Sequence, residues 1–307
     1  MSQNLNTNAQ GPRESAGAES RLTLDCYQAT ARRIESADRH LLHELTLGVF
    51  WPHRDHDLDL FLTLGEGYLA IDEIGRAMGS AMYFNMGGDF AMLGMMVTAP
   101  RLQTQGAGRW LLNSIMTDCE GRDLRLSATH AGYSLYESAG FIPVNRIWQH
   151  QGIARDIHSP TPAQGIETRA LMPEDVPALL AIDQPAFGAD RSEVLKVLLD
   201  LSEGRIALCN GEIVGYALMR PFGRGKVIGP VVAEADRIAM QMIAPLVQAN
   251  VGSFMRLDTP LQSEPFTGFL AAAGMGVYET VTEMRIGPHR RSSEGIQLFG
   301  LAAHSIG

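Results

Sequence analysis

The sequence predicts an α/β (α+β) chain of two similar units, each with a mixed, mostly antiparallel twisted sheet flanked by helices. Its 307 residues are about twice the ordinary domain length of about 150 residues. Short strand-like runs alternate with amphipathic helices, and the order of elements in the first half recurs in the second. A composition of 45% apolar and 19% charged residues suits buried cores. It excludes a disordered chain, a collagen-like fibre and a disulfide mini-protein.

The first unit is expected over residues 26–150, after a disordered polar tail at residues 1–25. Ser36 caps the first helix, whose apolar residues follow helical spacing. Gly75 and the Gly87-Gly88 pair supply turns between three strand-like runs, which therefore form an antiparallel meander. The expected elements, in order, are helices at 36–45 and 57–64, strands at 68–71, 77–84 and 90–97, a helix around 110–116, a strand at 124–128, a helix at 133–138 and a strand at 141–148.

A second unit is expected over residues 166–287, after a polar linker at residues 151–165 that contains two prolines. Its expected elements are a strand at 167–171, helices at 173–183 and 192–201, strands at 205–208, 213–219 and 226–232, a helix at 236–248, a strand at 253–258, a helix at 265–273 and a strand at 277–286. When Val97 is aligned with Val231, Gly140 falls on Gly274. This order indicates an internal duplication.

Charge and cysteine content narrow the class of protein. With 25 Lys and Arg against 34 Asp and Glu, the net charge is −9, which opposes binding to nucleic acid or an anionic membrane and suits a small cationic partner. Cys26, Cys119 and Cys209 lie far apart, so we expect neither disulfides nor a thiolate zinc site and infer a reducing cytoplasm. We expect neither a secretory signal nor a bilayer-spanning segment, because no apolar run is long enough.

The segment with the strongest chemical signal is Gln103-x-x-Gly106-x-Gly108, at a predicted strand-to-helix turn. The free N–H groups and positive dipole end of the helix would face a bound phosphate or pyrophosphate. Glycines there let the backbone approach the anion closely. The segment matches neither a Walker loop nor the G-x-G-x-x-G of a dinucleotide fold. A tight turn without a ligand is the structural alternative.

Leu135-Tyr136 and Gly140-Phe141 follow this loop after one further strand. Together with the loop they resemble the GNAT family of N-acetyltransferases, over roughly residues 26 to 150. The resemblance implies acetyl-CoA as co-substrate, no metal, and direct attack of a primary amine on the thioester. It implies Tyr136 as the general acid for the departing thiolate. The implied cofactor-binding residues are Met95, Val97, Gln103, Thr104, Gln105, Gly106, Ala107, Gly108, Arg109 and Thr129.

Within the resemblance, Met95 and Val97 would bond the pantetheine arm and polarise the thioester carbonyl, with Gly94 supplying a β-bulge. Two positions depart from the family pattern. Thr129 stands where family members usually carry an Asn, and the strand at 90–97 lacks the Glu that many members use as general base. The candidate bases are therefore His53, His130, Asp89 or an ordered water chain.

The acceptor site is expected near the segment from Phe50 to Leu62. Trp51 and His53 lie on the connection between the first two helices, which in the resemblance borders the acceptor pocket, and the second unit is expected to supply the opposite wall. The histidines of this segment lack a third partner of defined spacing, so a metal site is not predicted. The acceptor is a small-molecule or peptide amine of a kind that the sequence leaves open.

The second unit resembles a degenerate GNAT-like domain. In the alignment of Val97 with Val231, Gln103 falls on Arg237, Gly106 on Met240, Gly108 on Met242 and Tyr136 on Leu270. Two methionines where backbone must approach phosphate predict that this unit does not bind acetyl-CoA in the family's manner. The tail at 288–307 either docks on the first unit or mediates contacts in a homodimer. The rival functions are a non-catalytic acyl-CoA-binding regulatory protein and a nucleic-acid binder, the latter opposed by the charge.

Overall fold

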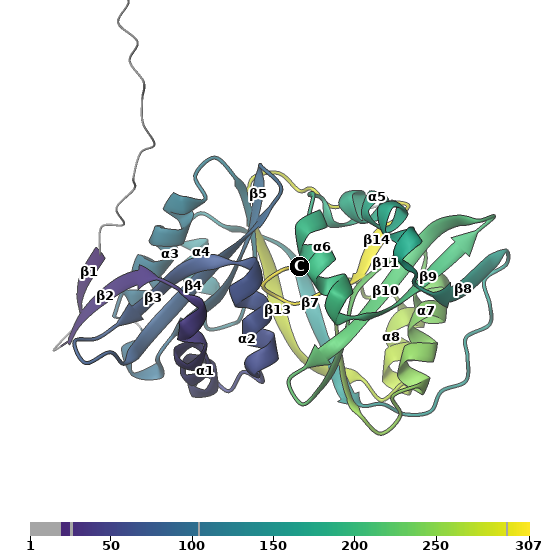
Figure 1. The fold of residues 1–307 in the computed structure, drawn as a ribbon, viewed down its shortest axis with the longest axis horizontal. Coiled ribbons are helices and arrows are strands. Elements are labelled where there is room, and N and C mark those ends of the chain that lie inside the picture. Colours follow the sequence, from purple (N-terminus) through teal and green to yellow (C-terminus); the bar gives the residue numbers. More distant parts are fainter. Residues whose placement is uncertain (1–19, 25–26, 104, 293) are drawn as a thin grey trace, which may run out of the picture.

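The computed structural model describes residues 20–24, 27–103, 105–292 and 294–307. Within these residues the strands form a 14-stranded sheet, and β14 pairs off the main path. Figure 1 shows two lobes, one from each half of the chain, with β7 and β13 between them. The tandem α/β architecture predicted from the sequence is therefore confirmed.

From the first helical segment onward the elements of the first half follow the predicted order, but two strands that were not predicted, β1 (Ser20–Leu24) and β2 (Tyr27–Arg33), precede it. The elements after these strands are η1 (Ser36–Asp38), α1 (Arg39–Gly48), α2 (Asp55–Leu64), β3 (Glu66–Ile71), β4 (Ala77–Met86), β5 (Phe90–Thr98), η2 (Pro100–Leu102), α3 (Ala107–Asp118), β6 (Asp123–Ala128), α4 (Tyr133–Glu137) and β7 (Ile142–Ile153). The predicted disordered tail to residue 25 is wrong for residues 20–24, because this short segment pairs antiparallel with β2 as β1.

The second half repeats the succession from β2 to β7, without a counterpart of η2, and adds one strand at its end. Its elements are β8 (Ile166–Ala170), η3 (Pro173–Asp175), α5 (Val176–Phe187), α6 (Ser192–Leu201), β9 (Glu203–Cys209), β10 (Glu212–Phe222), β11 (Gly225–Ala233), α7 (Asp236–Gln248), β12 (Phe254–Thr259), α8 (Glu264–Ala272), β13 (Gly276–Ile286) and β14 (Gln297–Gly300). β14 lies in the tail for which no element was predicted.

An arginine–aspartate pair begins the first helical segment of each half in the same way. Arg32 donates two hydrogen bonds to Asp38, which also accepts the backbone N–H of Glu35 at 2.8 Å. In the second half Arg169 binds Asp175 through two hydrogen bonds, and Asp175 accepts the N–H of Met172 at 2.8 Å. In each case the carboxylate satisfies a donor at the start of the helical segment. The repetition shows the duplication at the level of single hydrogen bonds.

The last long strand of each half is exchanged between the two parts of the sheet. β7, from the first half, pairs antiparallel with β12 of the second half, and β13 pairs antiparallel with β6 of the first. β7 and β13 also pair with each other along most of their length. The two halves therefore share one continuous sheet, which fixes their relative orientation.

Each half contains the same bulge, in β5 of the first half and in β11 of the second. Ser80 pairs with Val97 and Met82 with Gly94, so β5 has one extra residue between these pairs. In the second half, Ala217 pairs with Val231 and Met219 with Ile228. The two bulges coincide when Val97 is aligned with Val231. β5 pairs with β6 only from Phe90 to Leu93, so the described strands separate beyond that point.

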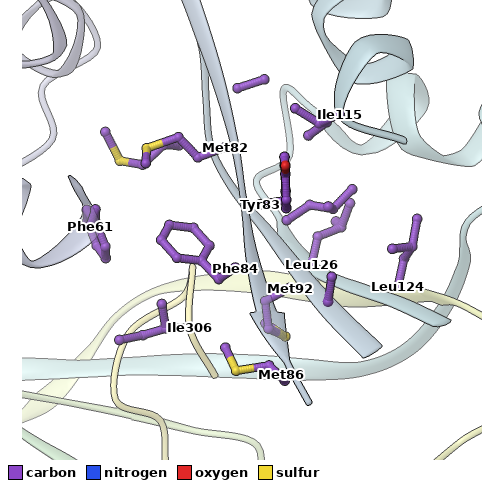
Figure 2. Close-up of a cluster of buried hydrophobic side chains, with 14 of the residues drawn as sticks. Phe61, Met82, Tyr83, Phe84, Met86, Met92, Ile115, Leu124, Leu126 and Ile306 are labelled. Atoms are coloured by element: carbon purple, nitrogen blue, oxygen red, sulfur yellow. The ribbon is translucent and has the colours of Figure 1, made fainter. Parts of the chain in front are cut away.

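The apolar core continues across the boundary between the halves. Ile306, from the C-terminal segment, is fully buried in the cluster that includes Phe61 and Phe84 of the first half and Phe187 of the second. Figure 2 shows Ile306 beside Phe84 and Met86. The C-terminal segment thus packs on the first half, which is one of the two alternatives predicted for it, and also reaches Phe187 of the second half.

Candidate active site

The N-terminus of α3 faces open space in the first half. Gly106 caps this helix with a φ of 92°, and a Cβ built on it meets no atom within 4 Å. The first four N–H groups of a helix have no partner within the helix, and the first i to i−4 bond here runs from Trp110 to Gly106. These donors and the positive dipole end suit an anion.

The remaining loop residues form a surface around this helix end. Gln103 and Gln105 are exposed, and the Gln103 side-chain amide donates to the Thr98 carbonyl at 3.4 Å. Ala107 is buried. A Cβ built on Gly108 lies 3.4 Å from Leu135 of α4, and Arg109 donates to Ser138 at the end of α4. Thr104 lies outside the described residues. The loop, α3 and α4 therefore meet at one place.

The bulge in β5 lies next to the point where β5 and β6 separate. Met95 has a φ of 49°, and its carbonyl accepts the Ser80 hydroxyl at 2.8 Å. Met95 and Met96 have no partner in the β4–β5 register, whereas Val97 pairs with Ser80. The expectation that Gly94 supplies the bulge is wrong, since Gly94 stays paired with Met82.

Gly94 instead makes room for the C-terminal segment. A Cβ built on Gly94 would overlap the Ser305 side chain. A side chain at this position would therefore displace Ser305. The absence of a side chain at Gly94 lets Ser305 lie directly against β5 next to the bulge.

Tyr136 is buried on α4 beside the same gap. Its ring makes an edge contact with Phe141 at 6.0 Å, and a Cβ on Gly132 would lie 3.0 Å from the Tyr136 ring. No hydrogen bond from its hydroxyl is found among the described residues, and burial raises the pKa of Tyr136. The hydroxyl therefore stays protonated at neutral pH and is free to donate.

Thr129 lies at the connection between β6 and α4. Its hydroxyl accepts the Gly132 N–H at 3.3 Å, and its carbonyl accepts the N–H groups of Gly132 and Tyr133. Thr129 therefore holds the start of α4 in place and keeps its own hydroxyl proton available for a further bond. Its role toward a cofactor stays a prediction.

Trp51 and His53 lie at the contact between the two halves. The His53 ring makes edge contacts with Trp51 at 5.7 Å, with Phe61 at 5.6 Å and with Phe222 of β10 at 6.0 Å. Close by, Asp57 accepts the Gly223 N–H at 3.0 Å. The α1–α2 connection thus packs on the β10–β11 hairpin, so surface from both halves meets here.

The three residues considered as general bases differ in their surroundings. Burial lowers the pKa of His53 to about 3, and its Nδ1 has no hydrogen-bond partner among the described residues. His130 is exposed. Arg290 holds the pKa of Asp89 below its ordinary value, and Asp89 precedes β5 at the end far from the bulge. Neither β4 nor β5 contains a carboxylate or a histidine.

His304 is a candidate that sequence reasoning missed. Its Nε2 lies 3.2 Å from the Asp258 carboxylate of β12, and Arg256 donates three hydrogen bonds to that carboxylate. Burial opposes ionisation of Asp258, but Arg256 and His304 keep the pKa of Asp258 below its ordinary value. Only folding of the C-terminal segment brings His304 next to Asp258 and brings its neighbour Ser305 against Gly94 of β5, so no local sequence pattern signals it.

The second half lacks both the loop and the gap. α7 begins three residues after β11 ends, and Met240 and Met242 are buried within this helix. β14 pairs with β11 at Val231 to Ala233, and Leu301 donates its N–H to the Asp258 carbonyl of β12 at 2.8 Å. The chain itself therefore fills the space between β11 and β12 that is open in the first half.

A separate surface cleft of about 500 Å³ lies between the β4–β5 turn and the α5–α6 connection. Its charged lining residues include Arg290, which is already paired with Asp89 at 2.8 Å. It lies at the end of β5 opposite to the bulge and carries none of the predicted site residues except Asp89, one of the three candidate bases. Among the described residues, no helix is long and apolar enough to cross a membrane.

Comparison with known proteins agrees with this geometry. The pattern described as "Acetyltransferase (GNAT) family" matches residues 34–141, and that described as "Acetyltransferase (GNAT) domain" matches residues 179–300. The uncharacterized N-acetyltransferase YitH of Bacillus subtilis (strain 168) is 28% identical over 214 residues, which cover 68% of this chain and 74% of that protein.

Three solved structures share the fold. A Pyrococcus horikoshii protein assigned as an acetyltransferase superposes with a TM-score of 0.74 at 20% identity, covering 91% of this chain and 96% of that one. A GCN5-related N-acetyltransferase from Sphaerobacter thermophilus gives 0.63 at 19% identity, with 87% and 98% covered. A tandem GNAT protein from the clavulanic acid biosynthesis pathway gives 0.60 at 12% identity, with 85% and 99% covered.

Each half of the chain thus matches a GNAT pattern, and the two halves together have the fold of a tandem GNAT protein. The chain therefore belongs to the GNAT superfamily and is an acyltransferase with two GNAT domains in tandem.

Proposed function

We propose that the first GNAT domain binds acetyl-CoA and transfers its acetyl group to a primary amine by direct attack, while the second domain binds no cofactor. The observation that carries this proposal is the combination of an open helix N-terminus at Gly106 with the end of β5–β6 pairing at Leu93, just before the bulge at Met95. In the second half, buried side chains of α7 take the place of the loop, and β14 pairs with β11 beside the equivalent bulge.

In this proposal the cofactor pyrophosphate lies on the N–H groups at the start of α3. Gly106 and Gly108 let the backbone approach it, and Gln103, Thr104, Gln105 and Arg109 surround it. The pantetheine arm enters the gap between β5 and β6, where Met95, Val97 and Thr129 offer hydrogen bonds. The N–H groups released by the bulge at Met95 polarise the thioester carbonyl.

The acceptor nitrogen attacks the thioester carbon and forms a carbon–nitrogen bond, which leaves a tetrahedral adduct with a negatively charged oxygen. Collapse of the adduct breaks the carbon–sulfur bond and expels the thiolate. Tyr136, kept protonated by its buried position, donates its proton to that sulfur. The positively charged nitrogen of the adduct loses a proton to a base.

We propose His304 as that base. His304 Nε2 lies 3.2 Å from the Asp258 carboxylate and 3.4 Å from Nη2 of Arg256. In the tautomer that carries its proton on Nε2, this nitrogen faces Asp258 as a donor and Nδ1 is the acceptor. Burial lowers the pKa of His304 to about 4, against the opposing effect of Asp258, so the ring is unprotonated at neutral pH. The proton on the adduct nitrogen is far more acidic than that of a free ammonium ion. A buried imidazole can therefore accept it while Asp258 stabilises the resulting cation.

The acceptor pocket is proposed between the two domains. Trp51 and His53 of the first domain and Phe222 of β10 in the second, whose rings are in contact, would form its base. Ser305 lies against Gly94, next to the bulge. Because residues of both domains would line this pocket, the second domain would contribute to acceptor binding although it holds no cofactor.

Release of coenzyme A tests this function. The purified chain should bind acetyl-CoA in titration calorimetry and release free thiol with at least one member of a broad panel of primary amines. Binding without thiol release for any amine would favour the non-catalytic acyl-CoA-binding protein. Absence of binding would contradict both.

A further inference from the structure

A cluster of arginines lies on the acceptor face of the sheet, next to the gap between β5 and β6. By register, Arg125 is opposite Met92, and Ser127 lies one residue beyond the last β5–β6 pair. Side chains alternate along strands, so Arg125 and Ser127 project from the same face as Gly94. Ser305 packs against Gly94 on that face.

β13, exchanged from the second half, adds two charged residues to this face. Glu283 pairs with Ser127, and Arg285 pairs with Arg125. Arg291, which follows β13, reaches Glu283 at 2.5 Å, and Arg125 lies 3.9 Å from Glu283. Two guanidinium groups, those of Arg125 and Arg291, therefore lie at one carboxylate, and Arg285 stands two residues from Glu283 on the same face of β13.

The neighbouring arginines already have partners of their own. Arg191 is bound to Asp183, and Arg290 to Asp89 and Asp123. The carboxylates of Asp183, Asp89 and Asp123 are therefore already paired with other arginines. Burial and the nearby Arg291 lower the pKa of Arg125 to about 9, and the pKa of His289 is also lowered by burial and by Arg125. The cluster has an excess of positive charge.

Several donors in the cluster have no hydrogen-bond partner among the described residues. They are Nε of Arg285, Nε and Nη2 of Arg291 and the hydroxyl of Ser127, all of them buried atoms. Both carboxylate oxygens of Glu283 also have no hydrogen-bond partner among these residues, but one carboxylate cannot balance the charge of Arg125, Arg285 and Arg291. The Arg291 side chain is only 8% exposed. Leaving buried charged donors unpaired costs free energy, and a bound anion would satisfy both the charge and the donors. A guanidinium presents paired donors that match a carboxylate or a phosphate.

We propose that Arg285, Arg291 and Ser127 bind an anionic group of the acceptor, so that the acceptor is an amine that also carries a carboxylate or a phosphate. This inference rests on the proposed acetyl transfer, because the cluster borders the gap where the thioester is expected. It also explains how a chain with a net charge of −9 selects an acceptor with an anionic group, since the local charge of the cluster is opposite in sign.

Anion binding is testable without any acetyl transfer. Thermal unfolding of the full chain is compared in sodium phosphate, sodium acetate and sodium chloride at equal ionic strength. We expect phosphate, acetate or both to raise the Tm by about 2–4 °C over chloride, and Arg291→Met to abolish the rise. Arg290→Met, which removes a guanidinium already held by two carboxylates, should keep the rise. If Arg291→Met fails to fold, Arg285→Gln takes its place, and Arg291→Lys should restore part of the effect.

The acceptor class is tested with matched amines at saturating acetyl-CoA. One pair is an amino acid and its amide, and the other is glucosamine 6-phosphate and glucosamine. The anionic member of at least one pair should be acetylated faster, and Arg291→Met should lower kcat/KM for it about 10- to 100-fold, with the KM for acetyl-CoA unchanged.

The unfolding experiment and the turnover experiment together distinguish failure of the anion site from failure of the proposed acetyl transfer. No anion-specific rise in Tm, or equal turnover of both members of each pair, overturns the anion site. A rise in Tm without turnover of any amine supports the anion site and contradicts the transferase.

Discussion

The side chain of Ser305 occupies the place where a Cβ on Gly94 would lie. This contact joins the end of the chain to the strand that borders the candidate thioester site. It puts His304 one residue away, beside Asp258 of the second domain. Residues that lie far apart in the sequence therefore meet at the gap between β5 and β6.

Gly94→Ala should disturb this contact. The added methyl group must displace Ser305, and overpacking of this kind lowers the free energy of unfolding by about 1–3 kcal/mol. Urea unfolding and steady-state turnover measure the two expected losses. Gly268→Ala in α8, where a Cβ meets no atom within 4 Å, is the control and should leave both unchanged or improve stability. Wild-type stability of Gly94→Ala would mean that the C-terminal segment does not pack on β5.

Tyr136→Phe should lower kcat by about 10²- to 10⁴-fold, because it removes the proton donor for the departing thiolate. The affinity for acetyl-CoA, measured by calorimetry, should change little, since the ring contacts with Phe141 remain. Tyr133→Phe, on the same helix, serves as the matched control. An unchanged kcat would assign Tyr136 to packing alone.

His304→Ala should lower kcat without weakening acetyl-CoA binding, and added imidazole should restore part of the lost turnover by replacing the missing base. His158→Ala, an exposed residue of the linker, should behave as the wild type. A variant that loses turnover but gains nothing from imidazole at any concentration would indicate a packing role for His304.

The Arg32–Asp38 pair makes stability depend on pH. Arg32 holds the pKa of Asp38 below its ordinary value, so the carboxylate stabilises the folded chain above about pH 4 and loses that effect as the pH falls through the lowered pKa. Asp38→Asn should therefore cost about 1–3 kcal/mol at pH 7. The difference from the wild type, measured by urea unfolding from pH 7 to pH 3, should shrink toward low pH. A constant difference would show that the charge of Asp38 does not contribute.

The local elements and the cofactor loop could be predicted from sequence because each depends on nearby residues. The spacing of apolar residues indicates α6, and Gly106 marks the turn before α3. The duplication that aligns Val97 with Val231 was likewise visible, and the bulges at these two residues coincide in the structure.

The exchange of β7 and β13 could not be predicted in this way. Both strands have the same alternating pattern whichever half they join, so only long-range pairing decides their place. β14 was missed because residues 297–300 read as part of a short apolar run in a tail, and only β11 gives that run a partner. His304 and the arginine cluster at Glu283 were also missed, because both depend on contacts between residues that are far apart in the sequence.

A single cofactor site at the start of α3 is the proposal on which the others depend. Titration calorimetry with acetyl-CoA on the wild type and on Gly106→Glu tests it most directly. Gly121→Glu is the matched control, because Gly121 also has a positive φ, of 82°, with no atom within 4 Å of a built Cβ. We expect one acetyl-CoA per chain for the wild type and for Gly121→Glu, and no binding for Gly106→Glu. Two bound molecules per wild-type chain, or wild-type affinity in Gly106→Glu, would contradict the single site.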